Sequence, residues 1–244
     1  MAIVHAVIII SAVSIWEILA HFSFVSPLII SSLEQIISFG EKNYNVVLAN
    51  LPDTLTEIGV SVAITIPLGI ILGVVIGYYY VLDSVFTPLL TALFAVPSFI
   101  FYPLFIVWFG LGIWSKVALA LSVAFFPLTL NTITGVRTID RTYIRFARSL
   151  GLSSFATMRR IVLPLASPAI LDSIKISLAF IIVGVIVSEL LGGFGGLGVL
   201  IAQFQSEIYV PGVYFVVLFV FLIVIIAILV STYFEYVAKK RVIA

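Results

Sequence analysis

Half of the twelve basic residues in this 244-residue chain lie in one short segment, between Gly135 and Pro164. The segment contains a single acid, Asp140, and it separates two hydrophobic stretches long enough to cross a bilayer. Its basic residues are Arg137, Arg141, Arg145, Arg148, Arg159 and Arg160. Such a loop in a membrane protein predicts a docking site for a cytoplasmic partner. The alternative is a basic anchor that only fixes the orientation of the chain and binds no partner.

Glu189 is the best functional candidate among the ionisable residues near the predicted spans, because it lies at the outer end of the fifth span after the uncharged run 176–188. A charged side chain at membrane depth is costly, so it is a functional candidate by default. The glycine-rich stretch 192–198 comes directly after it. Two interpretations stay open. Glu189 forms part of an external gate, or backbone amides of the glycine-rich stretch bind its carboxylate and make it an anchor for that loop.

The remaining charges near the spans have simpler interpretations. Asp172 and Lys175 are three residues apart, a spacing that predicts an ion pair on one helix face. Glu17 lies near the end of an apolar run, and we expect water to solvate it at the external interface.

Several kinds of chemistry are excluded by residue types. The chain has no cysteine, and its two histidines are too few and too close to the N-terminus for a histidine metal site, so we expect no metal. Serine-hydrolase elbows, His-Glu-x-x-His pairs and twin spanning aspartates are missing from the sequence, which therefore does not predict an enzyme. The stretch Gly192–Gly198 lacks the Lys-Ser/Thr of a phosphate-binding loop. We expect no cofactor and no nucleic acid on this chain, so the energy for any transport must come from another subunit.

Composition predicts an all-α membrane protein, with 63% hydrophobic and 9% charged residues. Soluble proteins carry about 25% charged residues. A spanning helix needs about 20 apolar residues. Six segments qualify and are expected to form one transmembrane domain over residues 1–244. They are residues 3–19, 58–80, 85–108, 117–134, 169–191 and 212–234.

Orientation follows from the basic residues in short loops. The loop 135–164 and the tail Lys239–Arg241 together hold nine of the twelve lysines and arginines. Two spans separate these two regions, so both are predicted to be cytoplasmic. Six spans then place both termini in the cytoplasm, and they place the segments 20–52 and 192–211 outside.

The basic loop is predicted to form two short helices with a break at Gly151, since glycine tolerates the left-handed backbone that ends many helices. Ser153 or Ser154 is expected to cap the second helix, and Pro164 to stop it. Phe155 and Ile161 then share one side of that helix.

The loop resembles the signature loop of permease subunits of binding-protein-dependent ATP-binding-cassette importers. That loop reads Glu-Ala-Ala, three residues, Gly, nine residues, Ile-x-Leu-Pro. Five positions match it at the right spacing: Ala147, Gly151, Ile161, Leu163 and Pro164. Arg145 stands where the family has Glu, Phe146 stands where it has Ala, and Asp140 is the nearest acid. The resemblance implies that these matched residues, with Leu152, Ser153, Phe155 and Arg159, contact an ATPase subunit.

Three further segments resemble the nitrate, sulfonate and taurine branch of the same family, in the family's order. They are Val96–Gly112, Phe126–Arg137 and Val187–Gly198. The resemblance implies a type I importer fold with a cytoplasmic coupling helix between spans four and five. It also suggests Pro97, Ser98, Pro103 and Glu189 as pathway or gate residues.

The family implies several partners in a prokaryotic cell membrane: a dimer of ATPase subunits that binds ATP and Mg, a second permease copy, expected to be identical, and an external solute-binding protein. The expected solute is a sulfonate-, nitrate- or taurine-like anion, or a vitamin or pyrimidine precursor. The alternative function is a secondary transporter or channel-like protein without an ATPase. Secondary transporters usually show paired repeats and several intramembrane charges, whereas this chain has few such charges.

Overall fold

The computed structural model describes the backbone of residues 2–22 and 24–243, and the side chains there except at residues 2, 3, 5, 6, 9, 234 and 237–243. This part of the chain is helical and contains no strand. It divides into two compact units, described separately below. Unit 1 comprises Met1–Thr54 and Glu189–Leu222, and unit 2 comprises Leu55–Ser188 and Ile223–Ala244. Three long helices continue across the boundary between the units.

Unit 1 contains α1 (Ala2–His21), the first part of α2 (Leu33–Tyr78), α9 (Leu197–Ser206) and the first part of α10 (Val210–Ile243). Aromatic rings hold these elements together. The Phe39 ring of α2 contacts the rings of Phe204, Tyr209 and Phe215 at centroid distances of 5.3, 5.4 and 5.5 Å. Edge-to-face contacts of this kind stabilise beyond the apolar area that they bury.

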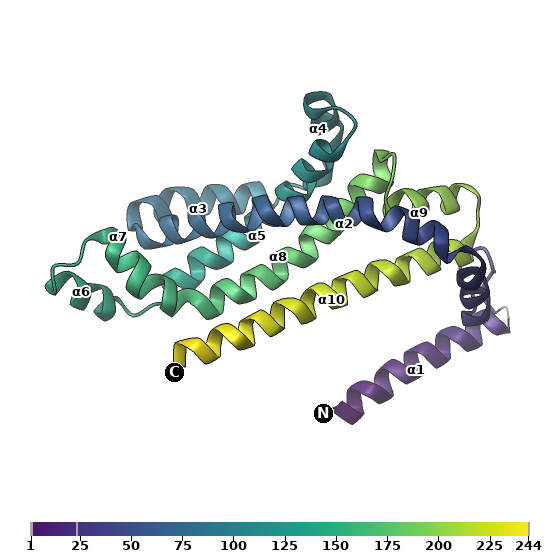
Figure 1. Ribbon diagram of the computed structural model, residues 1–244, viewed down its shortest axis with the longest axis horizontal. Coiled ribbons are helices and arrows are strands. Elements are labelled where there is room, and N and C mark those ends of the chain that lie inside the picture. Colours follow the sequence, from purple (N-terminus) through teal and green to yellow (C-terminus); the bar gives the residue numbers. More distant parts are fainter. Residues whose placement is uncertain (1, 23, 244) are drawn as a thin grey trace. The chain divides into compact units, whose positions relative to one another are not determined.

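Unit 2 holds the rest of α2, the last part of α10 and the elements between the two parts of unit 1. In chain order these are α3 (Tyr80–Phe94), the short 3-10 helix η1 (Ser98–Phe101), α4 (Tyr102–Phe109), α5 (Ile113–Arg137), α6 (Arg141–Ser149), α7 (Ser154–Thr157), the π-helix η2 (Met158–Val162) and α8 (Leu163–Gly192). The helices α6 and α7 form the tip of this unit (Figure 1).

Close packing of α2 on α5 follows from three glycines one helical turn apart, Gly69, Gly73 and Gly77. A β-carbon at each would lie within 3 Å of a side-chain atom of α5, on Leu128, Thr132 or Val136. Small residues at such spacing let two helix backbones approach each other closely, which is how helices associate where water gives no driving force. The glycine ridge therefore sets the distance between α2 and α5.

Four helices of the described part are long and apolar enough to cross a membrane: Leu33–Tyr78, Ile113–Arg137, the continuous run Ser154–Gly192, and Val210–Tyr233. The pair Tyr80–Phe94 and Ser98–Phe109 passes the same test together, but it is bent by 79°. Within α1 the apolar stretch Ile10–His21 is shorter. The described part of the chain therefore has four candidate spans, or five if the bent pair is one span, whereas the sequence predicts six. The sixth span stays a prediction.

The helix boundaries differ from two of the predicted spans. The third predicted span, 85–108, is not one helix: α3 ends at Phe94, and Pro97 begins a bend that leads through η1 into α4 (Figure 1). Residues before a proline disfavour helical backbone, which explains the break. The second predicted span, 58–80, forms the later part of a longer helix, because α2 begins at Leu33 and runs for 46 residues.

The prediction that Pro164 stops a helix was also wrong. Pro164 lies inside a helix that continues from Ser154 to Gly192. The π-helix Met158–Val162 comes one turn before it. A proline ring clashes with the carbonyl four residues earlier, here that of Arg160. The wider π-turn displaces this carbonyl, so the chain remains helical through the proline.

Candidate coupling segment and gate

The coupling segment (residues 137–164) begins with a capped helix. Asp140 is the N-cap of α6, and its Oδ1 accepts the backbone amide of Thr142 at 2.8 Å. Hydrogen bonds from the amide and hydroxyl of Thr142 lower the pKa of the Asp140 carboxyl below its ordinary value. The carboxylate therefore stays ionised where the positive end of the helix dipole stabilises it.

Gly151 ends α6 in the predicted left-handed conformation, with φ of +76°. Its amide donates to the Arg148 carbonyl at 3.0 Å, and the Leu152 amide donates to the Ala147 carbonyl at 3.1 Å. These two bonds form a Schellman motif. The predicted break at this glycine is confirmed, but only the first of the two helices is short, because the second continues from Ser154 to Gly192.

Ser153 starts α7 as its N-cap, and its Oγ accepts the amide of Ala156 at 3.2 Å. Sequence reasoning left Ser153 and Ser154 open as caps, and the structure selects Ser153. Because Leu152 alone separates the Schellman turn from this cap, α6 and α7 form a tight helical hairpin, called the coupling hairpin below (residues 141–157).

One side of the coupling hairpin is buried in unit 2. Ala147 is fully buried, and Ile144 lies in a cluster with Val162 and Ala166 of the following helix. The same cluster contains Val74 and Tyr78 of α2, Val136 of α5 and Ile170 of α8. The hairpin is therefore packed on the ends of three long helices.

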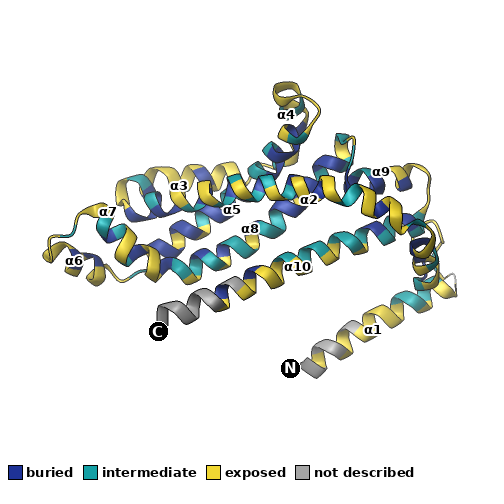
Figure 2. Cartoon of the chain, in the orientation of Figure 1, coloured by how far each residue is buried: buried dark blue, intermediate teal, exposed yellow. Residues whose placement is uncertain are grey.

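The other side of the hairpin is exposed, as the yellow ribbon of α6 in Figure 2 shows. Its apolar side chains have large exposed fractions, 62% for Phe146, 64% for Leu150 and 72% for Phe155. Of the other predicted coupling residues, Ser153, Arg159, Leu163 and Pro164 are exposed, whereas Leu152 and Ile161 are half-buried. The sequence-predicted set thus divides into a buried anchor, Ala147, and an outward surface.

Glu189 lies at the end of α8 in unit 1 and is only 1% exposed. Its carboxylate accepts the Gly198 amide at 2.7 Å and the Thr54 hydroxyl at 2.7 Å. The Thr54 oxygen in turn accepts the Leu197 amide at 2.8 Å. The contact of Glu189 with a backbone amide of the glycine-rich loop is therefore present, as the anchor interpretation requires.

These contacts cap α9. The first amides of a helix have no partner within it, and here Asn50 accepts the Gly196 amide at 3.3 Å while Thr54 and Glu189 accept the next two. Gly196 has φ of +109°, and a β-carbon there would collide with the Glu189 carboxylate. The glycine permits both the backbone turn and the close approach of the acid.

The other predicted pathway residues lie in unit 2, at the bend between α3 and α4. Pro97 is the N-cap residue of η1, and the Ser98 hydroxyl donates to the Ser122 carbonyl of α5 at 3.3 Å. Pro103 is exposed in the first turn of α4, where proline is tolerated. These three residues form one local group, and Glu189 belongs to the other unit.

Sequence reasoning missed an ion pair between two helices of unit 2. Lys116 Nζ of α5 lies 2.5 Å from Glu57 Oε1 of α2, with side chains 6% and 7% exposed. Both residues border long uncharged runs, and this position is the sequence signal that could have identified them as buried charges. Each lies one residue before a predicted span, 58–80 or 117–134, whereas α2 extends well beyond Glu57 on both sides.

Two other ion pairs connect helices of unit 2. Arg137, at the end of α5, lies 3.2 Å from Asp83 of α3. Lys175 lies 3.5 Å from Asp172, which confirms the predicted local pair, and it also binds Glu235 of α10. Glu17 is half-buried and its carboxylate accepts the Leu33 amide at 2.8 Å, and its solvation at the external interface stays a prediction.

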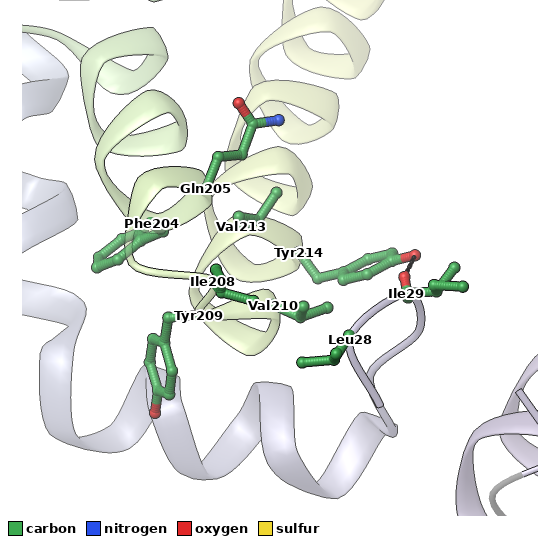
Figure 3. A pocket seen from close by; sticks show the side chains of 9 residues that line it. All are labelled: Leu28, Ile29, Phe204, Gln205, Ile208, Tyr209, Val210, Val213 and Tyr214. Carbon is green, nitrogen blue, oxygen red and sulfur yellow. Dashed lines mark hydrogen bonds between the residues drawn. The ribbon is translucent and has the colours of Figure 1, made fainter. Parts of the chain in front are cut away.

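A cavity of about 290 Å³ lies in unit 1 at the turn between α9 and α10. Figure 3 shows its lining, which includes Leu28, Phe204, Ile208 and Tyr214 and no charged side chain. Ile208 has φ of +53°, a strained value for a β-branched residue. No group of three or more metal-ligating side chains occurs in the described part of the chain.

Comparison with known proteins identifies the chain's relatives. A family model described as "Binding-protein-dependent transport system inner membrane component" matches residues 65–243. The chain is 28% identical to a formylaminopyrimidine transport permease of Halalkalibacterium halodurans over 200 residues, covering 82% of this chain and 80% of the relative. It is 24% identical to the taurine transport permease of Escherichia coli, covering 86% and 80%.

A putative aliphatic sulfonates transport permease of Bacillus subtilis is 39% identical over 114 residues, covering 47% of this chain and 41% of the relative. Among solved structures, an inward-facing MetNI methionine ABC transporter matches with a TM-score of 0.69 at 17% identity, covering 83% of this chain and 97% of that chain. At this identity the structural likeness establishes the fold alone.

Proposed function

Because the chain belongs to the binding-protein-dependent transport system inner membrane components, as an ABC importer permease of the sulfonate and taurine type, we propose that it forms a gated path for a small solute. It is a multi-pass inner membrane protein and a transport subunit rather than an enzyme. In the proposal a separate cytoplasmic ATPase dimer binds ATP and Mg, and an external binding protein delivers the solute. A second, identical permease copy completes the path, and both termini of each copy lie in the cytoplasm.

The observation that carries the proposal is the coupling hairpin. It lies where the sequence resembles the ATPase-contacting loop of the family, and its Schellman turn and serine cap define its shape without help from a partner. Its exposed face presents Phe146, Leu150 and Phe155 between arginines. Exposed aromatic and arginine side chains are enriched at protein interfaces.

Packing explains how such docking would move the pathway. Ile144 on the inner face of α6 contacts a cluster built from Tyr78 of α2, Val136 of α5 and Ile170 of α8. Protein interiors are close-packed and transmit displacement rather than absorb it. A shift of the hairpin by the ATPase therefore displaces the adjoining ends of α2, α5 and α8 together.

The solute is proposed from the relatives. Their names give formylaminopyrimidine, aliphatic sulfonates, taurine and riboflavin. We place the solute of this chain in the same range, as a sulfonate- or taurine-like anion or a vitamin or pyrimidine precursor. Mass spectrometry of the ligand retained by the external binding protein would identify it.

Purification of the tagged chain from its native membrane tests the proposal. We expect an ATPase subunit to accompany it and reconstituted vesicles to take up solute only with ATP, Mg and the binding protein. Uptake driven by an ion gradient without ATP, in a preparation that contains no ATPase, would instead establish the secondary-transporter alternative.

A further inference from the structure

The helix α6 has three distinct faces. Arg141, Arg145 and Arg148 follow each other at spacings of four and three residues, so they lie within an arc of roughly 60° on the helix. All three are exposed. The buried residues Ile144 and Ala147 lie about 100° away around the helix axis. We call the arginine face the cationic stripe.

An aromatic edge lies on the other flank of the buried face. Tyr143 is 54% exposed and Phe146 is 62% exposed. A groove that receives α6 therefore meets arginines along one wall and aromatic rings along the other. Because the two walls differ, α6 fits such a groove in one orientation.

The cationic stripe is not neutralised within the described part of the chain. None of its three arginines forms an ion pair there, whereas Arg137 nearby lies 3.2 Å from Asp83. Asp140 is the single acid between Gly135 and Pro164, and its carboxylate is hydrogen-bonded to Thr142 as the helix cap. Arg145 interacts with this carboxylate through space but forms no ion pair with it. The stripe thus keeps its charge available for a partner.

Arg145 also departs from the loop that this segment resembles, because the family pattern has Glu at this position. The departure replaces an acid with a base in the middle of the stripe. We infer that the cationic stripe fits an acidic wall in the docking groove of the ATPase subunit, and that Arg145 makes the chain specific for an ATPase with such a wall. This inference rests on the proposed function.

A membrane surface is the other anionic partner that arginines bind. An amphipathic helix binds lipid by inserting its apolar face between the headgroups. The aliphatic face of α6, Ile144 and Ala147, is already buried within unit 2, so only the aromatic edge with Tyr143 and Phe146 is left for lipid. A protein groove, which contacts the exposed arginine and aromatic faces together, therefore explains the arrangement better.

Charge reversal tests the inference. Arg145→Glu should weaken binding of the co-purified ATPase to the detergent-solubilised permease about tenfold or more, whereas Arg145→Lys should weaken it less. Wild-type binding should also weaken as salt rises, because exposed charges are screened. The control is Lys42→Glu, at an exposed residue of unit 1, which changes the net charge by the same amount as Arg145→Glu. This variant should bind the ATPase as the wild type does.

Selection for restored transport in the Arg145→Glu background should recover ATPase substitutions that replace an acid with Lys or Arg. Normal, salt-insensitive binding by Arg145→Glu would overturn the inference and leave the proposed function intact. Binding that is normal in detergent while uptake depends on Arg145 and on anionic lipid would assign the stripe to the membrane, and would also overturn it. If the wild type binds no ATPase at any salt concentration, the proposed function itself is wrong.

Discussion

Removal of the Glu189 side chain should loosen the cap of α9. In Glu189→Ala the Gly198 amide and the Thr54 hydroxyl both lose the acceptor that lies 2.7 Å from each. A buried donor left without a partner costs about 1–3 kcal/mol, so two such donors cost about 2–6 kcal/mol, before any cavity is counted. For a protein of this size each kcal/mol lowers Tm by roughly 2–4 °C.

Glu189→Gln should be tolerated far better. The amide oxygen of Gln can still accept the Gly198 amide, and its NH₂ can donate to the Thr54 oxygen. That oxygen has two lone pairs, of which the Leu197 amide uses one. A single hydroxyl hydrogen is then left without its acceptor, so the expected cost is about 1–2 kcal/mol.

Thermal unfolding in detergent and ATPase activity in reconstituted vesicles measure these effects. Glu189→Ala should lower Tm by at least about 4 °C and raise ATPase activity in the absence of the binding protein, whereas Glu189→Gln should lower Tm less than Glu189→Ala does and keep ATPase coupling close to wild type. Glu207→Ala, which removes an exposed carboxylate of the same unit, is the matched control and should change little. Wild-type Tm and coupling in Glu189→Ala would refute the capping argument, and failure of Glu189→Gln in transport alone would show that the negative charge itself acts in the pathway.

Three further outcomes are expected. Gly151→Asp should abolish transport and reduce ATPase co-purification while the chain still inserts, because a side chain at φ of +76° costs about 1–2 kcal/mol and adds a charge to the docking surface; normal complex assembly would contradict this. Single cysteines at Glu41 and Ser154, in a chain that has none, should react with an impermeant thiol reagent from opposite sides of the membrane, and labelling from one side would refute the topology. Lys116→Met should destabilise the protein by about 3–5 kcal/mol by leaving the Glu57 charge in the interior, and Lys116→Met combined with Glu57→Leu should recover most of the loss in Tm; equal Tm values for the single and double variants would refute this account.

Local signals explain which predictions succeeded. The break at Gly151, the Ser153 cap and the Asp172–Lys175 pair each depend on residues within one or two helical turns, so sequence spacing was sufficient. The general class, an apolar helical bundle, followed from composition in the same way. Local signals fail where a neighbouring helix decides the outcome.

Proline and the charged residues illustrate that failure. Pro97 interrupts the predicted third span, whereas Pro164, one turn after a π-helix, and Pro127 both lie inside helices, so a proline alone does not predict where a helix ends. Glu57 is neutralised by Lys116, which lies 59 residues further along the chain. No sequence pattern indicates that pairing, because it depends on how α2 and α5 pack.

The acid that caps α9 has a consequence for solute selection. A helix N-terminus attracts anions, since its free amides and its dipole both favour negative charge. At α9 the amides of residues 196–198 are already bonded to Asn50, Thr54 and Glu189, so the chain's own carboxylate occupies the place that a sulfonate group would take. A sulfonate arriving there meets a fixed negative charge and would have to displace it. The amides at the start of α9 are therefore not available to bind an anion, and an anionic solute would have to be recognised elsewhere.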